Sequence, residues 1–134
     1  MITAKLSTQD RPEVWWDSDP AVRVRADFPL SARTGAEHSA VVYFELEPGR
    51  ALGRHTDSAE EVLLVLDGTV EVTVGEERAE VAAGGLALVP EMVPHNVRNV
   101  GEGVARVAGF FPSGHVRAEF DQPFAPAGQR VFEF

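Results

Sequence analysis

The residues best suited to chemistry gather in one stretch, GRHTDSAEE at positions 53–61, which holds one of the four histidines and three carboxylates. Imidazole nitrogens and carboxylate oxygens bind divalent metals, and carboxylates also carry protons in catalysis. Along an extended strand, residues of equal parity point to one face. His55, Asp57 and Glu61 therefore share a face if the chain stays extended, whereas Glu60 points away.

A second cluster, VPHNVRN at positions 93–99, places His95 and Asn99 on one face in the same way. It lies far from His55 in the chain, but neighbouring strands of a sheet close such separations easily. Two histidines and a carboxylate form the facial triad of non-haem iron oxygenases, which leaves positions open for O₂ and substrate. In that arrangement His55, Asp57 and His95 bind the metal, and Glu61 is a fourth ligand or a base.

The segments around these clusters are short, rich in Val, Leu and Phe, and punctuated by 12 Gly and 9 Pro. One strand stops at Asp67-Gly68, a favoured hairpin dipeptide, and the next alternates valines with Glu71 and Thr73. Because no convincing amphipathic helix separates the strands, the pattern predicts an all-β sandwich or barrel. The predicted strands span 39–47, 61–66, 69–74, 78–83, 85–90, 95–100 and 104–111.

The two ends of the chain are less regular, although neither reads as a separate domain. Residues 1–35 offer VWW and VRVRADF as edge strands, and residues 112–134 read as a Pro-rich tail that wraps the body. We therefore expect one domain over 1–134, with a core barrel at about 36–112, an N-terminal arm and a C-terminal tail.

The run VLLVL at 62–66 is apolar on both strand faces, so both faces must be covered. The second face lies against the other sheet or against a partner subunit. Together with the aromatic VWW segment, this run predicts a homodimer.

The spacing of the two clusters resembles the two motifs of the cupin superfamily. Gly49-x5-His55-x-Asp57-x3-Glu61-x6-Gly68 is similar to the first motif, with Asp57 where a second histidine usually stands. The second motif is matched by Gly84-x5-Pro90-x-Met92-x2-His95-x3-Asn99, with Met92 in place of the usual glycine. The resemblance implies a double-stranded β-helix, or jelly-roll barrel, that holds a divalent metal (Fe, Mn, Ni or Zn) through His55, Glu61 and His95. Small single-domain cupins of this kind resemble the quercetin-dioxygenase-like group.

The aspartate at position 57 leaves two alternatives open. As a ligand, its carboxylate adds negative charge and shifts the preference toward harder ions such as Mn²⁺, Mg²⁺ or Fe²⁺. Because aspartate is shorter than histidine, it can instead miss the metal and orient His55. The site is then a centre of His55, Glu61 and His95, or a site without metal.

Composition excludes several classes of function. The formal net charge of -9 repels nucleic acid and anionic membranes, which are therefore not expected as partners. The absence of cysteine excludes disulfides and thiolate metal sites. The N-terminus has no apolar signal-peptide core, and no run approaches the ~18 residues of a membrane span, so we expect a cytoplasmic protein.

These observations favour a mononuclear Fe(II)- or Mn(II)-dependent, dioxygenase-like oxidoreductase that acts on a small organic substrate, with Glu61 as the catalytic base. The same barrel also hosts isomerases, cyclases and lyases, so the fold does not settle the reaction. The alternative from another class is a non-catalytic cupin that binds or senses a small molecule.

Overall fold

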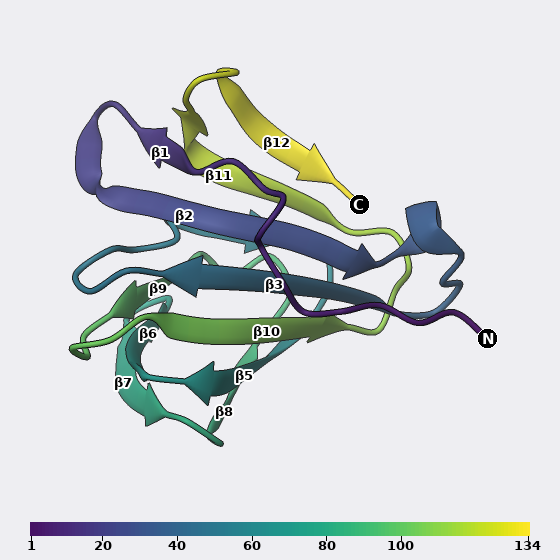
Figure 1. The fold of residues 1–134 in the computed structure, drawn as a ribbon, viewed down its shortest axis with the longest axis horizontal. Coiled ribbons are helices and arrows are strands. Elements are labelled where there is room, and N and C mark those ends of the chain that lie inside the picture. Colours follow the sequence, from purple (N-terminus) through teal and green to yellow (C-terminus); the bar gives the residue numbers. More distant parts are fainter.

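The computed structural model describes all 134 residues and is built almost entirely of β-strands (Figure 1). Its one helical element is a 3-10 turn, η1 (Ala32–Thr34), and no helix is long or apolar enough to cross a membrane. The strands are β1 (Val14–Trp16), β2 (Asp19–Leu30), β3 (Ala40–Leu46), β4 (His55–Asp57), β5 (Glu61–Asp67), β6 (Thr69–Val74), β7 (Glu77–Ala82), β8 (Leu86–Val89), β9 (His95–Asn99), β10 (Ala105–Phe111), β11 (Arg117–Phe124) and β12 (Gln129–Glu133).

The strands form two six-stranded antiparallel sheets that pack face to face. One sheet has the order β1-β2-β3-β10-β5-β8, and the other has the order β12-β11-β4-β9-β6-β7. Neighbours in each sheet are often far apart in sequence: β10 lies between β3 and β5, and β9 lies between β4 and β6. The predicted all-β jelly roll, a double-stranded β-helix, is confirmed.

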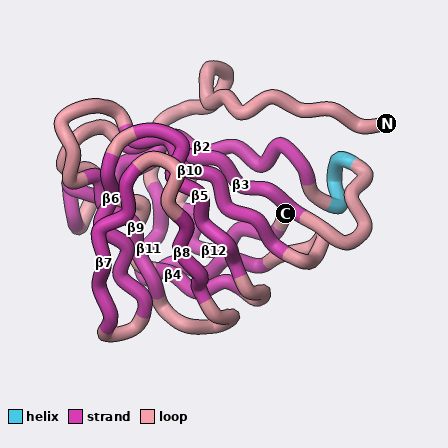
Figure 2. The backbone as a smooth tube through the Cα atoms, turned by 90° about the horizontal axis from the view of Figure 1, so that it is seen from below, coloured by secondary structure: helices cyan, strands magenta, loops and turns pink.

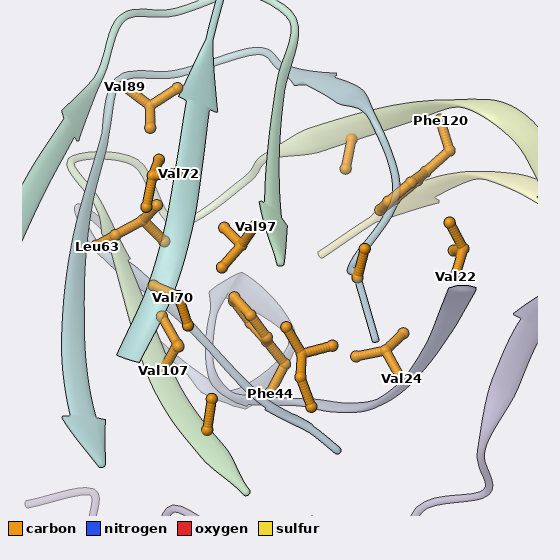
Figure 3. Packing of buried hydrophobic residues seen from close by; sticks show 14 of the residues in the cluster. Val22, Val24, Phe44, Leu63, Val70, Val72, Val89, Val97, Val107 and Phe120 are labelled. Carbon is orange, nitrogen blue, oxygen red and sulfur yellow. The ribbon is translucent and has the colours of Figure 1, made fainter. Parts of the chain in front are cut away.

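The core fills the space between the sheets and follows the alternation of the strands. In β6, Val70 and Val72 are buried while Glu71 between them is partly exposed. Figure 3 shows these valines with Val97 of β9, together with Leu63 and Val107 of the other sheet. Each fully buried Val or Leu contributes about 1.5–3 kcal/mol to folding, so this core holds the site strands in place.

Both ends of the chain are more regular than the sequence suggested. VWW forms the edge strand β1, and VRVRADF lies inside the longer strand β2. The Pro-rich tail expected at 112–134 is instead largely the strands β11 and β12, and β11 pairs with β4. Pro123 is tolerated because the β11–β12 register breaks between Glu119 and Phe124, where no regular ladder bond is needed.

The two-sided apolar run of β5 buries one face and leaves the other open. On the outer face, Val62 is 36% exposed and lies in register between Phe110 of β10 and Leu88 of β8, which are 42% and 58% exposed. We call Phe110, Val62 and Leu88 the apolar row. The N-terminal segment crosses the outer side of the same sheet over β2 and β3, where Thr8 hydrogen-bonds Glu45 (Figures 1 and 2). It leaves the apolar row uncovered.

Candidate metal centre

Four predicted residues meet between the two sheets. His55 and Asp57 lie on β4, and His95 on β9 pairs in register with His55. Glu61 begins β5 on the opposite sheet. All four side chains are buried, whereas Glu60 is exposed. His55, Asp57 and Glu61 therefore converge and Glu60 points away, as expected, but they do so from two facing sheets rather than along one extended strand.

Asp57 contacts both histidines, and its contact with His95 is the shortest in the group. Asp57 Oδ2 lies 3.0 Å from His95 Nε2 and 3.6 Å from His55 Nε2. One ligand atom from each of these three residues lies within 4.8 Å of the others, a grouping that can hold a metal ion. Glu61 lies beside this group, with Oε1 3.5 Å from His95 Nε2.

Both imidazole rings are oriented by backbone carbonyls two residues earlier in the chain. Nδ1 of His55 lies 2.8 Å from Gly53 O, and Nδ1 of His95 lies 2.9 Å from Val93 O. A carbonyl oxygen only accepts, so each Nδ1 carries the proton and donates. Each Nε2 then points its lone pair into the site, which is the tautomer that a metal requires.

Two atoms of the site lack a hydrogen-bond partner although they are fully buried: Asp57 Oδ2 and His95 Nε2. In the tautomer set by Val93, both atoms are acceptors, and they face each other at 3.0 Å. Such a pair repels unless a cation lies between the two atoms, and an unsatisfied buried polar group costs about 1–3 kcal/mol. A proton on His95 or a bound metal satisfies both atoms, so this donor set fits a divalent metal.

Without metal, the electrostatics of the site place a proton on His95. Burial lowers the pKa of His95, but the hydrogen bonds that the protonated ring donates to Asp57 and Glu61, together with the charge of Asp57, outweigh it and raise the pKa to about 10. Burial raises the pKa of Asp57, but its hydrogen bonds and charge interactions with His55 and His95 lower it to about 2. Burial also raises the pKa of Glu61, against the hydrogen bond from His95. Metal and proton thus compete for the same atoms.

The geometry favours Asp57 over Glu61 as the carboxylate ligand of a metal ion. The family resemblance implied His55, Glu61 and His95 as ligands, with Asp57 as an open alternative. The structure gathers His55, Asp57 and His95 most closely and places Glu61 at their edge. This set of two imidazoles and a carboxylate suits Fe, Mn, Ni or Zn, with Glu61 available as a further ligand or a proton acceptor.

The remaining motif residues support the site from outside it. Met92 has a left-handed backbone, φ 61°, which glycine adopts more easily, and its N–H donates to Asp57 O at 2.8 Å. Asn99 is buried, and its side-chain amide donates to Gly103 O in the following loop and to Leu46 O at the end of β3. His38 and His115 are exposed and lie outside the site.

Sequence reasoning missed two features of the site. Gly109 of β10 lies against Glu61, because a methyl group at position 109 would overlap the Glu61 carboxylate. A glycine in the middle of the predicted strand 104–111 is the signal that marks such a close approach. The second feature is an aromatic wall: the cavity at the site, about 40 Å³, is lined by apolar side chains that include Phe28, Phe111 and Phe134.

Residues 42–111, just over half of the chain, match the family model for the Cupin domain. The chain belongs to the cupin family. No curated protein sequence matches it.

Several solved structures share the fold at low sequence identity. Oxalate decarboxylase from Bacillus subtilis superposes with a TM-score of 0.66 at 19% identity, over 74% of this chain and 27% of that chain. An oxalate oxidase in complex with the substrate analogue glycolate gives 0.65 at 20% identity, over 74% and 56%. The conserved SPY1581 protein of unknown function from Streptococcus pyogenes gives 0.57 at 20% identity, over 67% and 74%. The chain spans little more than a quarter of the length of the oxalate decarboxylases, so these similarities describe the fold.

Proposed function

We propose that this cupin is a mononuclear metal-dependent enzyme, an oxidoreductase of the dioxygenase-like kind, that acts on a small organic substrate. The observation that carries the proposal is the pair of buried acceptor atoms, Asp57 Oδ2 and His95 Nε2, which face each other at 3.0 Å without a hydrogen bond. Burying such a pair is costly unless a proton or a metal ion lies between the two atoms.

His55, Asp57 and His95 would hold the metal, with Glu61 at the edge of the group. A bound Fe²⁺ or Mn²⁺ supplies a Lewis acid with open positions for substrate or O₂. The carbonyls of Gly53 and Val93 keep both imidazoles in the ligating tautomer. The aromatic wall limits water at the reacting atoms, because the cavity of about 40 Å³ has room for about one water molecule.

Glu61 is the catalytic base in this proposal. It enters from the opposite sheet and contacts His95, so it faces the metal group without being one of its closest members. Because burial raises its pKa, its proton affinity is closer to neutral pH than that of an exposed glutamate. It can therefore accept a proton from a bound substrate and return it later in the reaction.

The reaction class is chosen because two imidazoles and one carboxylate leave open positions for O₂. The same site supports an isomerase, cyclase or lyase, and a non-catalytic binding or sensing protein is the alternative from another class. Two of the similar structures are an oxalate decarboxylase and an oxalate oxidase, so oxalate belongs in the first substrate panel together with small aromatic and enolic compounds. The expected cytoplasmic location stays a prediction.

The test begins with the metal content of the purified protein. Elemental analysis should find a divalent transition metal, and His55→Ala or His95→Ala should abolish it. His115→Ala is the matched control, because that histidine is exposed and lies outside the site. The absence of metal together with no rebinding after chelation would refute the proposal. O₂ uptake by the Fe²⁺-loaded protein across the panel then separates an oxygenase from a binding protein.

A further inference from the structure

A second cavity lies on the far side of the aromatic wall. This cavity, which we call the vestibule, has a volume of about 300 Å³, and its lining includes Arg11, Arg33 and Phe132. Two aromatic residues, Phe28 and Phe134, line both the vestibule and the cavity at the metal group. These two side chains therefore form the partition between the site and the vestibule.

The partition is a stacked pair held from two strands. The rings of Phe28, on β2, and Phe134, which follows β12, lie 4.2 Å apart at an interplanar angle of 29°. Phe134 is buried, and its backbone exchanges two hydrogen bonds with Val116. Its ring also meets the edge of Phe111 at 5.7 Å. The backbone is fixed, so the pair can separate only by side-chain rotation or by local opening of β12.

The cavity volumes show why the partition matters. The cavity at the metal group, about 40 Å³, is little more than the ~30 Å³ share of a single water molecule. Pockets for organic ligands usually span about 300–1,000 Å³, the size of the vestibule rather than of the site. The cavity at the metal group is therefore too small for an organic substrate by itself, and parting Phe28 and Phe134 would join it to the vestibule.

We propose that the stacked pair Phe28–Phe134 is the gate of the site, and that its opening joins the two cavities into the binding pocket for a small planar organic anion. This inference rests on the proposed function for the reaction, but the gate itself does not require a metal. The aromatic walls favour a flat, apolar body that takes the place of the ring contact.

The charge preference comes from the rim of the vestibule. Arg11 pairs with Asp27 at 2.7 Å, and Glu133 pairs with Arg117 at 3.4 Å. Arg33 lines the same cavity and takes part in no ion pair. On a chain with a net charge of -9, this arginine is a free cation at the mouth, suited to a carboxylate of the incoming ligand.

The gate is tested on metal-free protein with diethyl pyrocarbonate, which modifies free imidazole nitrogens. His38 and His115 are exposed and should react fast in every variant, which makes them internal references. In Phe134→Ala, the modification of His55 measured by peptide mass spectrometry should speed up by at least ~10-fold. Phe132→Ala is the matched control, because Phe132 lines only the vestibule and packs on Phe120 and Phe124. It should speed up the reaction by less than ~3-fold.

Phe28→Ala provides a second opening of the gate if Phe134→Ala does not fold. Equal acceleration in Phe134→Ala and Phe132→Ala would overturn the gate, because a loosened β12 would then explain both. No acceleration in either gate variant would overturn it as well.

The ligand class is tested on Co²⁺-loaded protein by its visible spectrum, with benzoate and benzamide as probes. Benzoate should bind more tightly than benzamide, and Arg33→Gln should weaken benzoate by at least ~5-fold while leaving benzamide unchanged. Equal affinities in the wild type, or no effect of Arg33→Gln, would overturn the anion preference. A wild-type protein that binds no Co²⁺ would instead refute the proposed function, while the reaction with diethyl pyrocarbonate still reports on the gate.

Discussion

Replacing Asp57 by asparagine removes one charge from the buried site and keeps the shape of the side chain. In the metal-free protein, the pKa of Asp57 is lowered from 3.8 to about 2. At about 1.36 kcal/mol per pKa unit, the ionised carboxylate stabilises the fold by about 2 kcal/mol. Because the pKa is lowered, this stability is present above about pH 4 and is lost as the pH falls through about 2. The raised pKa of His95 reflects the same pair plus Glu61, so the two effects are not added.

Two measurements follow for Asp57→Asn. Urea unfolding of metal-free protein at pH 7 should show a loss of about 2 kcal/mol, and this difference should shrink toward pH 3. Metal affinity, measured by competition with a chromophoric chelator, should fall by more than ~100-fold, or about 2.8 kcal/mol. Asp121→Asn is the control, because its pair with Arg54 is exposed and should contribute less than about 1 kcal/mol.

The two readouts refute different parts of the reasoning. A loss of affinity of only ~10 to 100-fold is typical of a residue that orients a ligand, and it would mean that Asp57 acts on His55 rather than on the metal. Unchanged stability at pH 7 would mean that the buried carboxylate is not held ionised by the histidines.

Four further predictions concern the metal group and the outer face. Glu61→Gln should weaken metal binding or abolish turnover, while Glu60→Gln, at the exposed residue just before β5, should leave both unchanged. The reverse result would mean that the register is wrong. Because the pKa of His95 is raised to about 10, a metal ion must displace the proton of His95 when it binds. The affinity for the metal should therefore rise about tenfold per pH unit from about pH 7 to 9, and pH-independent binding would contradict this. Metal-free protein should in turn lose the stability of its protonated His95 as the pH rises through about 10. The wild type should be a homodimer through the apolar row, and a wild type that light scattering shows to be monomeric would contradict this. Val62→Glu or Leu88→Glu should yield monomers, because a two-fold interface sets the introduced like charges face to face.

Strand geometry alone predicted which residues of the site point inward. Adjacent residues of an extended chain point in opposite directions, and Glu61 is buried while Glu60 is exposed. The pairing of His55 with His95 likewise follows from the order of strands in the jelly roll. Asp57 lies 3.0 Å and Glu61 3.5 Å from His95 Nε2, a difference that strand parity does not resolve.

The tail was misread for a related reason. Its prolines argue against a central strand, yet β11 carries Pro123 at a break in register and still forms a wall beside His55. Local sequence gives no sign that Phe134 would stack on Phe28, because the two rings come from opposite ends of the chain. Such long-range contacts are set by how the sheets pack, so the gate appears only in three dimensions.

Gly109 shows how a single strand glycine links the fold to the chemistry. Gly109→Ala places a methyl group where the Glu61 carboxylate and Val42 now lie, and the buried surroundings leave Glu61 little room to retreat. We expect the carboxylate to be displaced from His95, with turnover lost and metal affinity lowered by less than ~10-fold, because His55, Asp57 and His95 stay in place. Gly103→Ala is the matched control, since nothing lies within 4 Å of its added methyl group. If Gly109→Ala costs as much metal affinity as Asp57→Asn, then Glu61 is a ligand of equal standing and the division of roles between the two carboxylates is wrong.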